Sequence, residues 1–225
     1  MISKRTKIII TGILLLLLSA IIVTLYFGYK GTPWGKANFH SKAVQYLNQS
    51  NYTIPNEYGI STIHSFITGD YMSIITLPNG IQFQVLEDYQ KQLYDNYYAS
   101  KIEHTISNEA SDVVKDIFGG DARESFHMGD GYISRKLTET SSYTNLGRDI
   151  RINASFSVNL EDGSAFADED ALIRKCMRFL EWIKKNNYDS DVYISNEEYA
   201  ITIRLDELRK LDEQGLRSLI SRWKN

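Results

Sequence analysis

Residues 8–27 read IIITGILLLLLSAIIVTLYF, a run of about 20 residues without one charged side chain. An α-helix rises about 1.5 Å per residue, so this run spans about 30 Å, which is the thickness of the hydrocarbon core of a bilayer. A helix this apolar is more stable in lipid than in water. The sequence therefore predicts a transmembrane helix over residues 8–27, followed by a folded part of about 200 residues.

A cleaved signal peptide is the alternative explanation of this run. Its apolar region usually has about 7 to 15 residues and ends in a cleavage site with two small residues flanking a third. Here the run is longer, and Leu18 stands where the outer small residue of a site ending at Ala20 is needed. We therefore expect an uncleaved signal anchor.

The charges around the run predict its orientation. Lys4, Arg5 and Lys7 lie in the tail formed by residues 1–7, and the positive-inside rule places such a tail in the cytoplasm. Three lysines between residues 30 and 42 oppose this orientation, although long domains cross the membrane largely regardless of such charges. We expect a single-pass protein of the cell membrane with its C-terminal part outside the cell.

Four aromatic residues cluster where the helix leaves the bilayer: Tyr26, Phe27, Tyr29 and Trp34. Aromatic rings favour the headgroup layer, so we expect these four side chains to contact the membrane interface. Pro33 and the two glycines within residues 31–35 oppose continuation of the helix. The sequence thus predicts a short linker over residues 28–35.

The charge balance argues against a nucleic-acid partner. The chain holds 25 Lys and Arg against 28 Asp and Glu, and without the three bases of the tail its net charge is -6. Nucleic-acid binding needs a basic field that neutralises phosphates. A single cysteine, Cys176, excludes an intramolecular disulfide and zinc sites built from cysteine pairs, and its place in an apolar helical stripe predicts core packing.

The first folded part, residues 36–120, shows a change from helical to strand periodicity and back. Apolar residues after Lys36 recur with helical spacing, and three strand-like runs follow, separated by Gly69 with Asp70 and by Pro78-Asn79-Gly80. Residues 87–118 lack Gly and Pro and predict a long helix, with a slip in phase that allows two stacked helices or a bend. The strands are expected at 58–67, 71–77 and 81–86.

The second folded part, residues 121–225, starts after Gly119 and Gly120, which predict a domain boundary. Its sequence predicts a strand at 132–138, an alternating strand at 152–160, a helix after Asp168 and a hairpin of 192–195 with 199–205. Residues 206–223 have a helical pattern that allows a break before Asp212 or at Gly215. The fold class is therefore α+β: a transmembrane helix, then two small α+β domains with mainly antiparallel sheets.

No sequence motif for chemistry is present. A phosphate-binding glycine loop, a nucleophile elbow and a dinucleotide fingerprint are all missing from the sequence, so we assign no catalytic residue and expect no cofactor. The histidines are scattered without ligand spacing, so we expect no metal site: His40, His64, His104 and His127.

The densest acidic patch is Glu161, Asp162, Asp168, Glu169 and Asp170. Carboxylates bind hard cations such as calcium, but the spacing is not that of an EF-hand loop. A turn followed by acids at the start of a helix explains the same residues, because the helix dipole favours negative charge there. Both interpretations of the patch stay open.

Tyrosine is abundant, with 15 residues. A ring that carries a hydroxyl offers stacking and hydrogen bonding, so such residues could line a groove for a sugar or a peptide. Tyr94, Tyr97 and Tyr98 are the best exposed candidates, and ordinary packing in sheets and helices is the competing explanation.

The segment Gly31-Thr32-Pro33-Trp34-Gly35-Lys36, directly after the single anchor, resembles the start of the YfjL-like proteins of Gram-positive bacteria. The resemblance continues through the first sheet, with Glu87-Asp88-Tyr89 in place of the usual Asp-Asp-Tyr. It implies a single-pass membrane location and this layout, and it implies no activity. The order of one helix and three strands in residues 36–86 is also similar to PepSY-type modules, which are thought to regulate extracytoplasmic peptidases.

We therefore expect a membrane-anchored, extracytoplasmic binding or interaction module of the cell envelope rather than an enzyme. Its expected partners are the lipid bilayer and an envelope protein or a cell-wall component. A PepSY-like regulator of a peptidase is one alternative, and an enzyme whose site forms only on folding is another.

Overall fold

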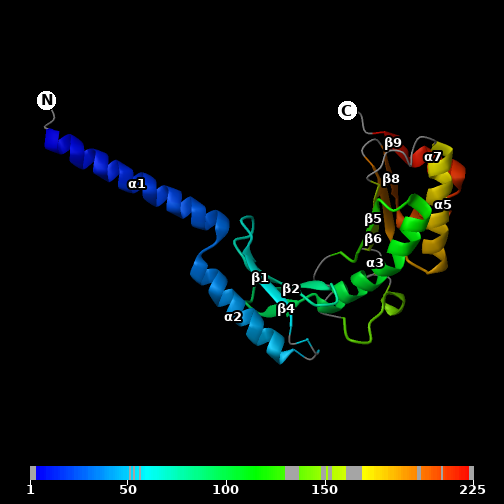
Figure 1. The fold of residues 1–225 in the computed structure, drawn as a ribbon, viewed down its shortest axis with the longest axis horizontal. Helices are drawn as coiled ribbons and strands as arrows, with labels where there is room; N and C mark the ends of the chain where they lie inside the picture. Colours follow the sequence, from blue (N-terminus) through cyan, green and yellow to red (C-terminus); the bar gives the residue numbers. More distant parts are fainter. Residues whose placement is uncertain are drawn as a thin grey trace. The chain divides into compact units, whose positions relative to one another are not determined.

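The computed structural model describes residues 4–50, 52, 54–55, 57–129, 137–147, 151, 154–160, 169–196, 199–208 and 210–222, and only the backbone of residues 4–10, 199 and 220–222. The chain forms two compact units, residues 1–95 and residues 96–225. Both mix helices with a sheet, so the predicted α+β class is confirmed (Figure 1).

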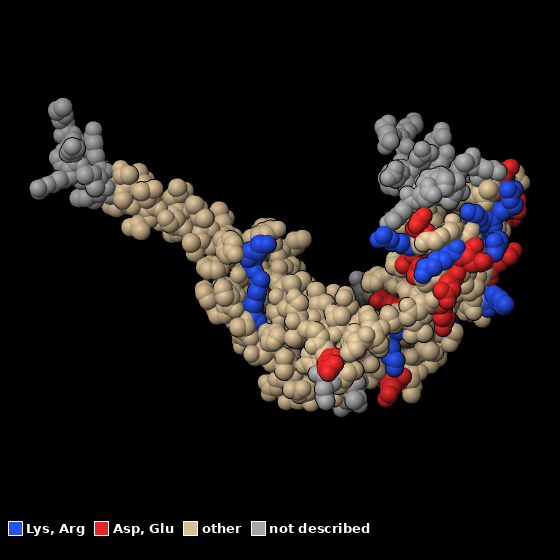
Figure 2. Space-filling model, viewed as in Figure 1, with Lys and Arg blue, Asp and Glu red and all other residues tan. Residues whose placement is uncertain are grey.

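The apolar run lies in α1 (Lys4–Lys30), a helix of 27 residues that is long and apolar enough to cross a membrane. Between Thr11 and Tyr29 it carries no charged residue, as Figure 2 shows. Its polar side chains bond to its own backbone: Ser19 Oγ donates to the carbonyl of Leu15 at 2.7 Å, and Thr24 Oγ1 to that of Ala20 at 2.8 Å. Such internal bonds suit a helix surrounded by hydrocarbon.

The rest of the first unit is one helix on one sheet. α2 (Pro33–Gln49) lies against β1 (Gly59–His64) and β2 (Tyr71–Thr76). The sheet continues with β3 (Gln82–Glu87) and β4 (Leu93–Asp95), in the order β1-β2-β3-β4 with every pair antiparallel. The buried apolar residues of this unit recur with helical spacing on α2 and alternate along β2, β3 and the turn between them: Phe39, Ala43, Leu47, Ile75, Leu77, Ile81, Phe83 and Val85.

The joint between α1 and α2 is only two residues long, which corrects the predicted linker over residues 28–35. The hydroxyl of Tyr71 accepts a hydrogen bond from the backbone N–H of Thr32 at 3.0 Å and lies 3.2 Å from the side-chain hydroxyl of Thr32. Thr32 in turn caps α2 by accepting the N–H of Gly35 at 3.1 Å, with Pro33 in the first turn. Proline and glycine here start a helix rather than form a loop.

The two glycines of the joint allow close packing. Gly31 has a φ of +73°, and a Cβ placed there would lie 2.6 Å from Cβ of His64. A Cβ at Gly35 would overlap the hydroxyl of Tyr71. Both positions therefore require glycine, because the sheet approaches the backbone of the joint too closely for a side chain.

The predicted helix over residues 87–118 is wrong in its first part. Residues 88–92 form a turn, and β4 pairs with β3. The carboxylate of Asp88 accepts the backbone N–H groups of Gln90 and Gln92, both at 2.9 Å, and Lys91 adopts a φ of 63°. An Asp side chain that accepts a hydrogen bond from the backbone two residues ahead favours a turn. Residues 88–92 therefore form a turn, although their apolar periodicity predicts a helix. This turn explains the slip in phase.

The second unit starts with α3 (Tyr97–Phe118) and β5 (Ala122–His127). It continues with the 3-10 turn η2 (Tyr143–Asn145), β6 (Ser155–Leu160), α5 (Glu169–Lys185) and β7 (Asp191–Ser195). The last elements are β8 (Tyr199–Ile203), α6 (Leu205–Leu208), α7 (Glu213–Leu219) and β9 (Ile220–Arg222).

The second sheet has the order β5-β6-β7-β8-β9, and α5 connects β6 to β7 as a parallel crossover, whereas the other pairs are antiparallel. The prediction of the strand before α5, of α5 and of the β7–β8 hairpin is confirmed. β5 was not predicted, and β9 replaces the end of the helix predicted over 206–223 because it pairs with the edge of β8. The strand predicted at 132–138 lies almost wholly outside the described residues.

The division after Asp95 differs from the predicted boundary after Gly120. The apolar stripe of α3, which includes Ile102, Ile106 and Val114, is buried in one core with Phe156 and Phe179 of the second half. The glycines after α3 form a tight connection to β5, in which the N–H of Ala122 bonds to the carbonyl of Gly119 at 3.2 Å. Glycine pairs occur both in such turns and between domains, so the local sequence does not distinguish them.

Replacing Gly31 with alanine tests the joint. We expect Gly31→Ala to lower the thermal midpoint of the full-length protein in detergent, because the left-handed backbone and the contact with His64 together cost at least about 1 kcal/mol. Near-ultraviolet circular dichroism measures the midpoint. Gly12→Ala is the matched control, since no atom lies within 4 Å of its added Cβ. Equal midpoints for the two variants would contradict the close packing of the joint.

Candidate functional site

The four predicted interface residues lie at the end of α1 and the start of α2. Tyr26, Tyr29 and Trp34 are 59%, 58% and 67% exposed, and Phe27 is half-buried. The ring centroids of Phe27 and Trp34 are 5.6 Å apart, and those of Tyr26 and Phe27 are 5.7 Å apart. The contact of these four side chains with a membrane interface stays a prediction.

The second unit contains a cleft of about 350 Å³ on the N-terminal half of α3, hereafter the α3 cleft. The segment from Glu139 to Thr144 and the residues after α5 form its other walls. A volume of this size falls within the range of small-molecule sites. Its lining is Tyr98, Lys101, Ile102, Thr105, Ile106, Glu109, Glu139, Ser141, Ser142, Tyr143, Thr144, Asn186 and Tyr188.

The floor of the α3 cleft is buried and apolar. Ile102 and Ile106 contribute the apolar stripe of α3, and the rings of Tyr143 and Tyr188 lie 5.5 Å apart beside them. Both rings also belong to the aromatic core, because Phe126 lies 5.3 Å from Tyr143 and 6.3 Å from Tyr188. The floor is therefore held by the packing of the whole unit and does not have to form when a ligand arrives.

Hydrogen bonds fix the two floor tyrosines. The hydroxyl of Tyr143 donates to the carbonyl of Asp189 at 2.5 Å, and that of Tyr188 donates to Glu109 Oε2 at 2.8 Å. Burial raises the pKa of Tyr143 and of Tyr188 above the usual value, and the carboxylates of Asp189 and Glu109, respectively, raise it further. Both hydroxyls therefore stay protonated at neutral pH.

The rim of the cleft is polar. Lys101, Thr105 and Glu109 follow one another at every fourth position of α3, and all three are exposed. Opposite them, Glu139 and Ser142 belong to a segment that is held by its own hydrogen bonds. The N–H of Ser142 donates to Asn145 Oδ1 at 2.9 Å, and Asn145 Nδ2 donates to the carbonyl of Thr140 at 3.0 Å. Hydroxyls and two carboxylates thus surround an apolar floor.

Two other depressions lie on the second unit within the described residues. One, of about 480 Å³, lies between α3 and α5 and includes the ion pair of Arg178 with Asp116 at 3.0 Å, whose side chains are 58% and 75% exposed. The other, of about 340 Å³, lies along α6 and α7. The α3 cleft differs from both in having two buried, hydrogen-bonded tyrosines at its floor, so it is the candidate binding site.

Of the three tyrosines singled out in the sequence, Tyr98 lines the α3 cleft, whereas Tyr94 lies in β4 and Tyr97 lies outside the lining. The sequence did not single out Glu109, Glu139 or Thr105. The polar stripe at positions 101, 105 and 109 was visible as a spacing of four. The opposite wall of the cleft, around Glu139, could not be recognised from the sequence, because no local pattern links that segment to α3.

The scattered histidines have separate neighbours. His40 and His64 lie in the first unit, and the ring of His64 contacts that of Tyr71 in a tilted arrangement with centroids 4.9 Å apart. In the second unit His104 lies 3.0 Å from Asn108, and His127 Nδ1 lies 3.0 Å from Glu103. Within the described part of the chain, no group of three or more His, Cys, Asp or Glu is arranged to hold a metal ion.

The acidic patch is described only in part, because residues 161–168 lie outside the described residues. Glu169 and Asp170 occupy the first turn of α5, and both face Arg217 of α7 in ion pairs. The hydrogen bond from Arg217 and its positive charge hold the pKa of Asp170 below its usual value. These two carboxylates therefore join two helices.

Comparisons of the chain with protein-family models, with curated proteins and with solved structures gave no match. Its functional interpretation therefore depends on the geometry of its own residues.

Removing the Tyr188 hydroxyl tests the fixed floor of the cleft. Tyr188→Phe loses the hydrogen bond to Glu109, and we expect the free energy of unfolding to fall by about 1 kcal/mol and the thermal midpoint by about 2–4 °C. Glu109→Gln keeps an acceptor oxygen and is expected to lower the midpoint less. Thermal unfolding followed by near-ultraviolet circular dichroism compares the two, and an unchanged midpoint for Tyr188→Phe would show that the bond contributes nothing.

Proposed function

We propose that this chain is a single-pass membrane protein that displays a ligand-binding module on the outside of the cell, and that the α3 cleft is its binding site. The observation that supports binding most directly is the preformed cleft itself: a buried aromatic floor with hydroxyl and carboxylate groups converging on its rim. Small-molecule sites combine these features.

The membrane anchor is the first part of the proposal. α1 is apolar along its described surface and hydrogen-bonds its own serine and threonine, which is consistent with a helix in lipid. The positive charges Lys4, Arg5 and Lys7 favour a cytoplasmic N-terminus and an exported C-terminal part. Membership in the YfjL-like family, suggested by residues 31–36, is part of the same proposal.

The rim indicates the chemistry of the ligand. Among the described residues that line the cleft, Glu109 and Glu139 outnumber the one cation, Lys101. Four side chains with aliphatic hydroxyls surround them: Thr105, Ser141, Ser142 and Thr144. Such a rim accepts hydrogen bonds from hydroxyl and amino groups, whereas the floor contacts an apolar face. A small wall fragment that carries sugar hydroxyls and a free amine fits this description. The limited volume favours a small ligand over the extended chain that a PepSY-like peptidase regulator would bind.

A topology reporter tests the proposed orientation. Alkaline phosphatase fused after Asn225 should be active in cells, because the enzyme folds only outside the cytoplasm. A second fusion that lacks residues 1–27 is the control, and it should lose activity together with the anchor. An inactive full-length fusion combined with an active cytoplasmic reporter at the same position would reverse the orientation.

Titration with soluble disaccharide–peptide fragments of the cell wall tests the cleft. Full-length protein in nanodiscs should bind them, as measured by calorimetry. We expect Glu139→Gln to weaken binding about tenfold, because a hydrogen bond to a charged group contributes about 1.5 kcal/mol or more. Thr105→Trp, which places a large ring in the mouth of the cleft, should abolish binding.

The matched control is Glu181→Gln, which removes an exposed carboxylate of α5 outside the α3 cleft. It should bind like the unaltered protein. Binding that survives Thr105→Trp would place the site elsewhere, and failure of the unaltered protein to bind the fragments would reject this ligand class.

A further inference from the structure

The turn between β1 and β2 exposes two large apolar side chains. Phe66 is 65% exposed and Ile67 is 92% exposed, which makes Ile67 the most exposed large hydrophobic residue among the described side chains. The neighbouring Ile63 of β1 is also exposed, at 39%. Adjacent exposed apolar side chains at the tip of a turn are unfavourable in water and indicate a contact surface.

The turn has a defined conformation. The N–H of Ser65 bonds to the carbonyl of Asp70, and the N–H of Gly69 bonds to the carbonyl of Ser65, both at 2.8 Å. Ser65 Oγ also accepts the N–H of Thr68 at 3.3 Å, and Gly69 adopts a φ of +74°. These bonds hold Phe66 and Ile67 at the tip, so their exposure follows from the structure of the turn.

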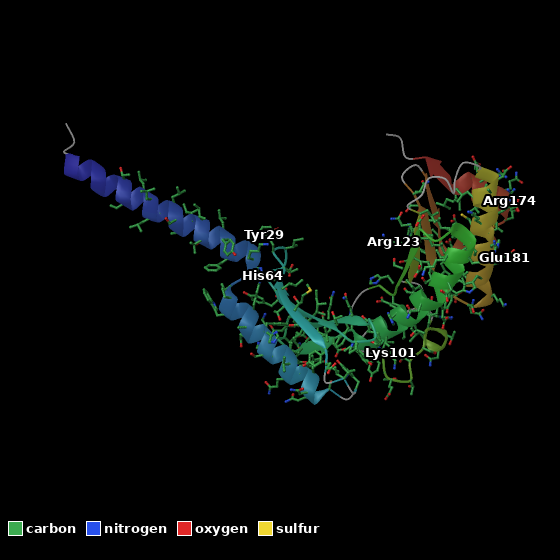
Figure 3. All side chains as sticks on the ribbon, viewed as in Figure 1. Tyr29, His64, Lys101, Arg123, Arg174 and Glu181 are labelled. Carbon is green, nitrogen blue, oxygen red and sulfur yellow. The ribbon has the colours of Figure 1, made fainter. Side chains whose placement is uncertain are left out.

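This tip lies beside the membrane-facing end of α1. The ring centroids of Phe66 and Tyr29 are 5.5 Å apart, and Figure 3 shows Tyr29 next to His64, the last residue of β1. Lys30 Nζ lies 5.1 Å from the centroid of the Tyr29 ring. The apolar surface of the turn is therefore continuous with the aromatic cluster at the end of the anchor.

The joint keeps the turn in this position. Tyr71 is the first residue of β2 and follows the turn directly, and its hydroxyl holds Thr32 between α1 and α2. His64 precedes the turn, and its side chain lies where any Cβ at Gly31 would have to be. Both ends of the turn are thus attached to the end of the anchor.

We propose that Phe66 and Ile67 enter the headgroup layer of the same membrane as α1 and form a second lipid contact of the first unit. This inference rests on the proposed membrane anchoring of α1. The lipid surface is the partner because the turn continues the interface cluster of a helix that spans the bilayer. The residues of the tip itself, Ser65 to Gly69, carry no charge, and Lys30, whose amine lies over the ring of Tyr29, suits lipid phosphates.

A second contact has a consequence for function. A single helix leaves the attached unit free to rotate and tilt against the membrane. An apolar turn buried about 5–10 Å into the boundary between headgroups and acyl chains, the depth typical of interfacial segments, would hold the sheet in one orientation. The first unit would then be held against the membrane by two contacts, α1 and the β1–β2 turn.

Site-specific fluorescence in liposomes tests this contact with the full-length protein. Three variants, Ile67→Cys, Val23→Cys and Asn79→Cys, each receive a small environment-sensitive fluorophore. Val23 lies in α1, and Asn79 is exposed in the turn at the opposite end of β2. Cys176 does not react near neutral pH because it is fully buried and burial raises the pKa of its thiol to about 12.

We expect the label at position 67 to shift its emission to the blue and to lose fluorescence when nitroxide lipids are present, as the label at position 23 does. The label at position 79 should instead be quenched by iodide in the water. If iodide quenches the label at position 67 while nitroxide lipids quench the label at position 23, the second lipid contact is overturned. The proposed membrane anchoring by α1 is then still supported.

Two further outcomes would also reject the inference. A label at position 23 that no lipid nitroxide quenches would overturn the proposed anchor together with the contact. A label at position 67 that is shielded from both iodide and lipid nitroxide would show that protein, such as a second copy of this chain, covers the turn.

Discussion

The hydrogen bond between the Tyr71 hydroxyl and the backbone of Thr32 is the contact on which the arrangement of the first unit depends. It attaches the first residue of β2 to the two-residue joint between α1 and α2. Because Gly31 and Gly35 have no side chains, the sheet can approach the backbone of the joint closely enough for this hydrogen bond to form. The end of α1, the start of α2 and the β1–β2 turn are thereby held together.

The second unit depends on aromatic packing instead. Phe126 and Tyr188 contact each other, and each of them also contacts the rings of Phe156 and Tyr143. α5 closes this cluster as the crossover between two parallel strands. The two tyrosines serve both the core and the α3 cleft, with their rings packed inward and their hydroxyls fixed by hydrogen bonds. Stability and the proposed binding surface therefore share residues, because the packing of the core also positions the floor of the cleft.

The sequence predicted elements well where one periodicity extends over a whole element. The stripe of α5 and the alternation of β6 are such cases, because each buries one face in the core of the second unit. The apolar run of α1 is another, because it is continuous over the whole described surface of the helix. It failed at residues 87–95, where the side chain of Asp88 organises a turn, and at 220–222, where pairing with β8 sets the conformation. Short segments have too few residues for a periodic signal to outweigh one hydrogen bond or one strand partner.

The candidate site also combines features that the sequence reveals with features that only folding creates. The polar stripe of Lys101, Thr105 and Glu109 could be read from its spacing on α3, yet its opposite wall around Glu139 and its floor of Tyr143 and Tyr188 come from distant parts of the chain. The sequence predicts Phe66 and Ile67 as the end of a strand. Only the structure shows that they lie in a turn and that Phe66 contacts Tyr29.

The sequence by itself determined the apolar N-terminal helix, the α+β class and most helices and strands, since these follow from the local balance of apolar and polar residues. Only the tertiary structure decided that the joint is rigid, that α3 belongs to the second unit and that a cleft forms beside it. Those features depend on contacts between residues far apart in the chain, and the free energy of such contacts is set by which surfaces meet on folding.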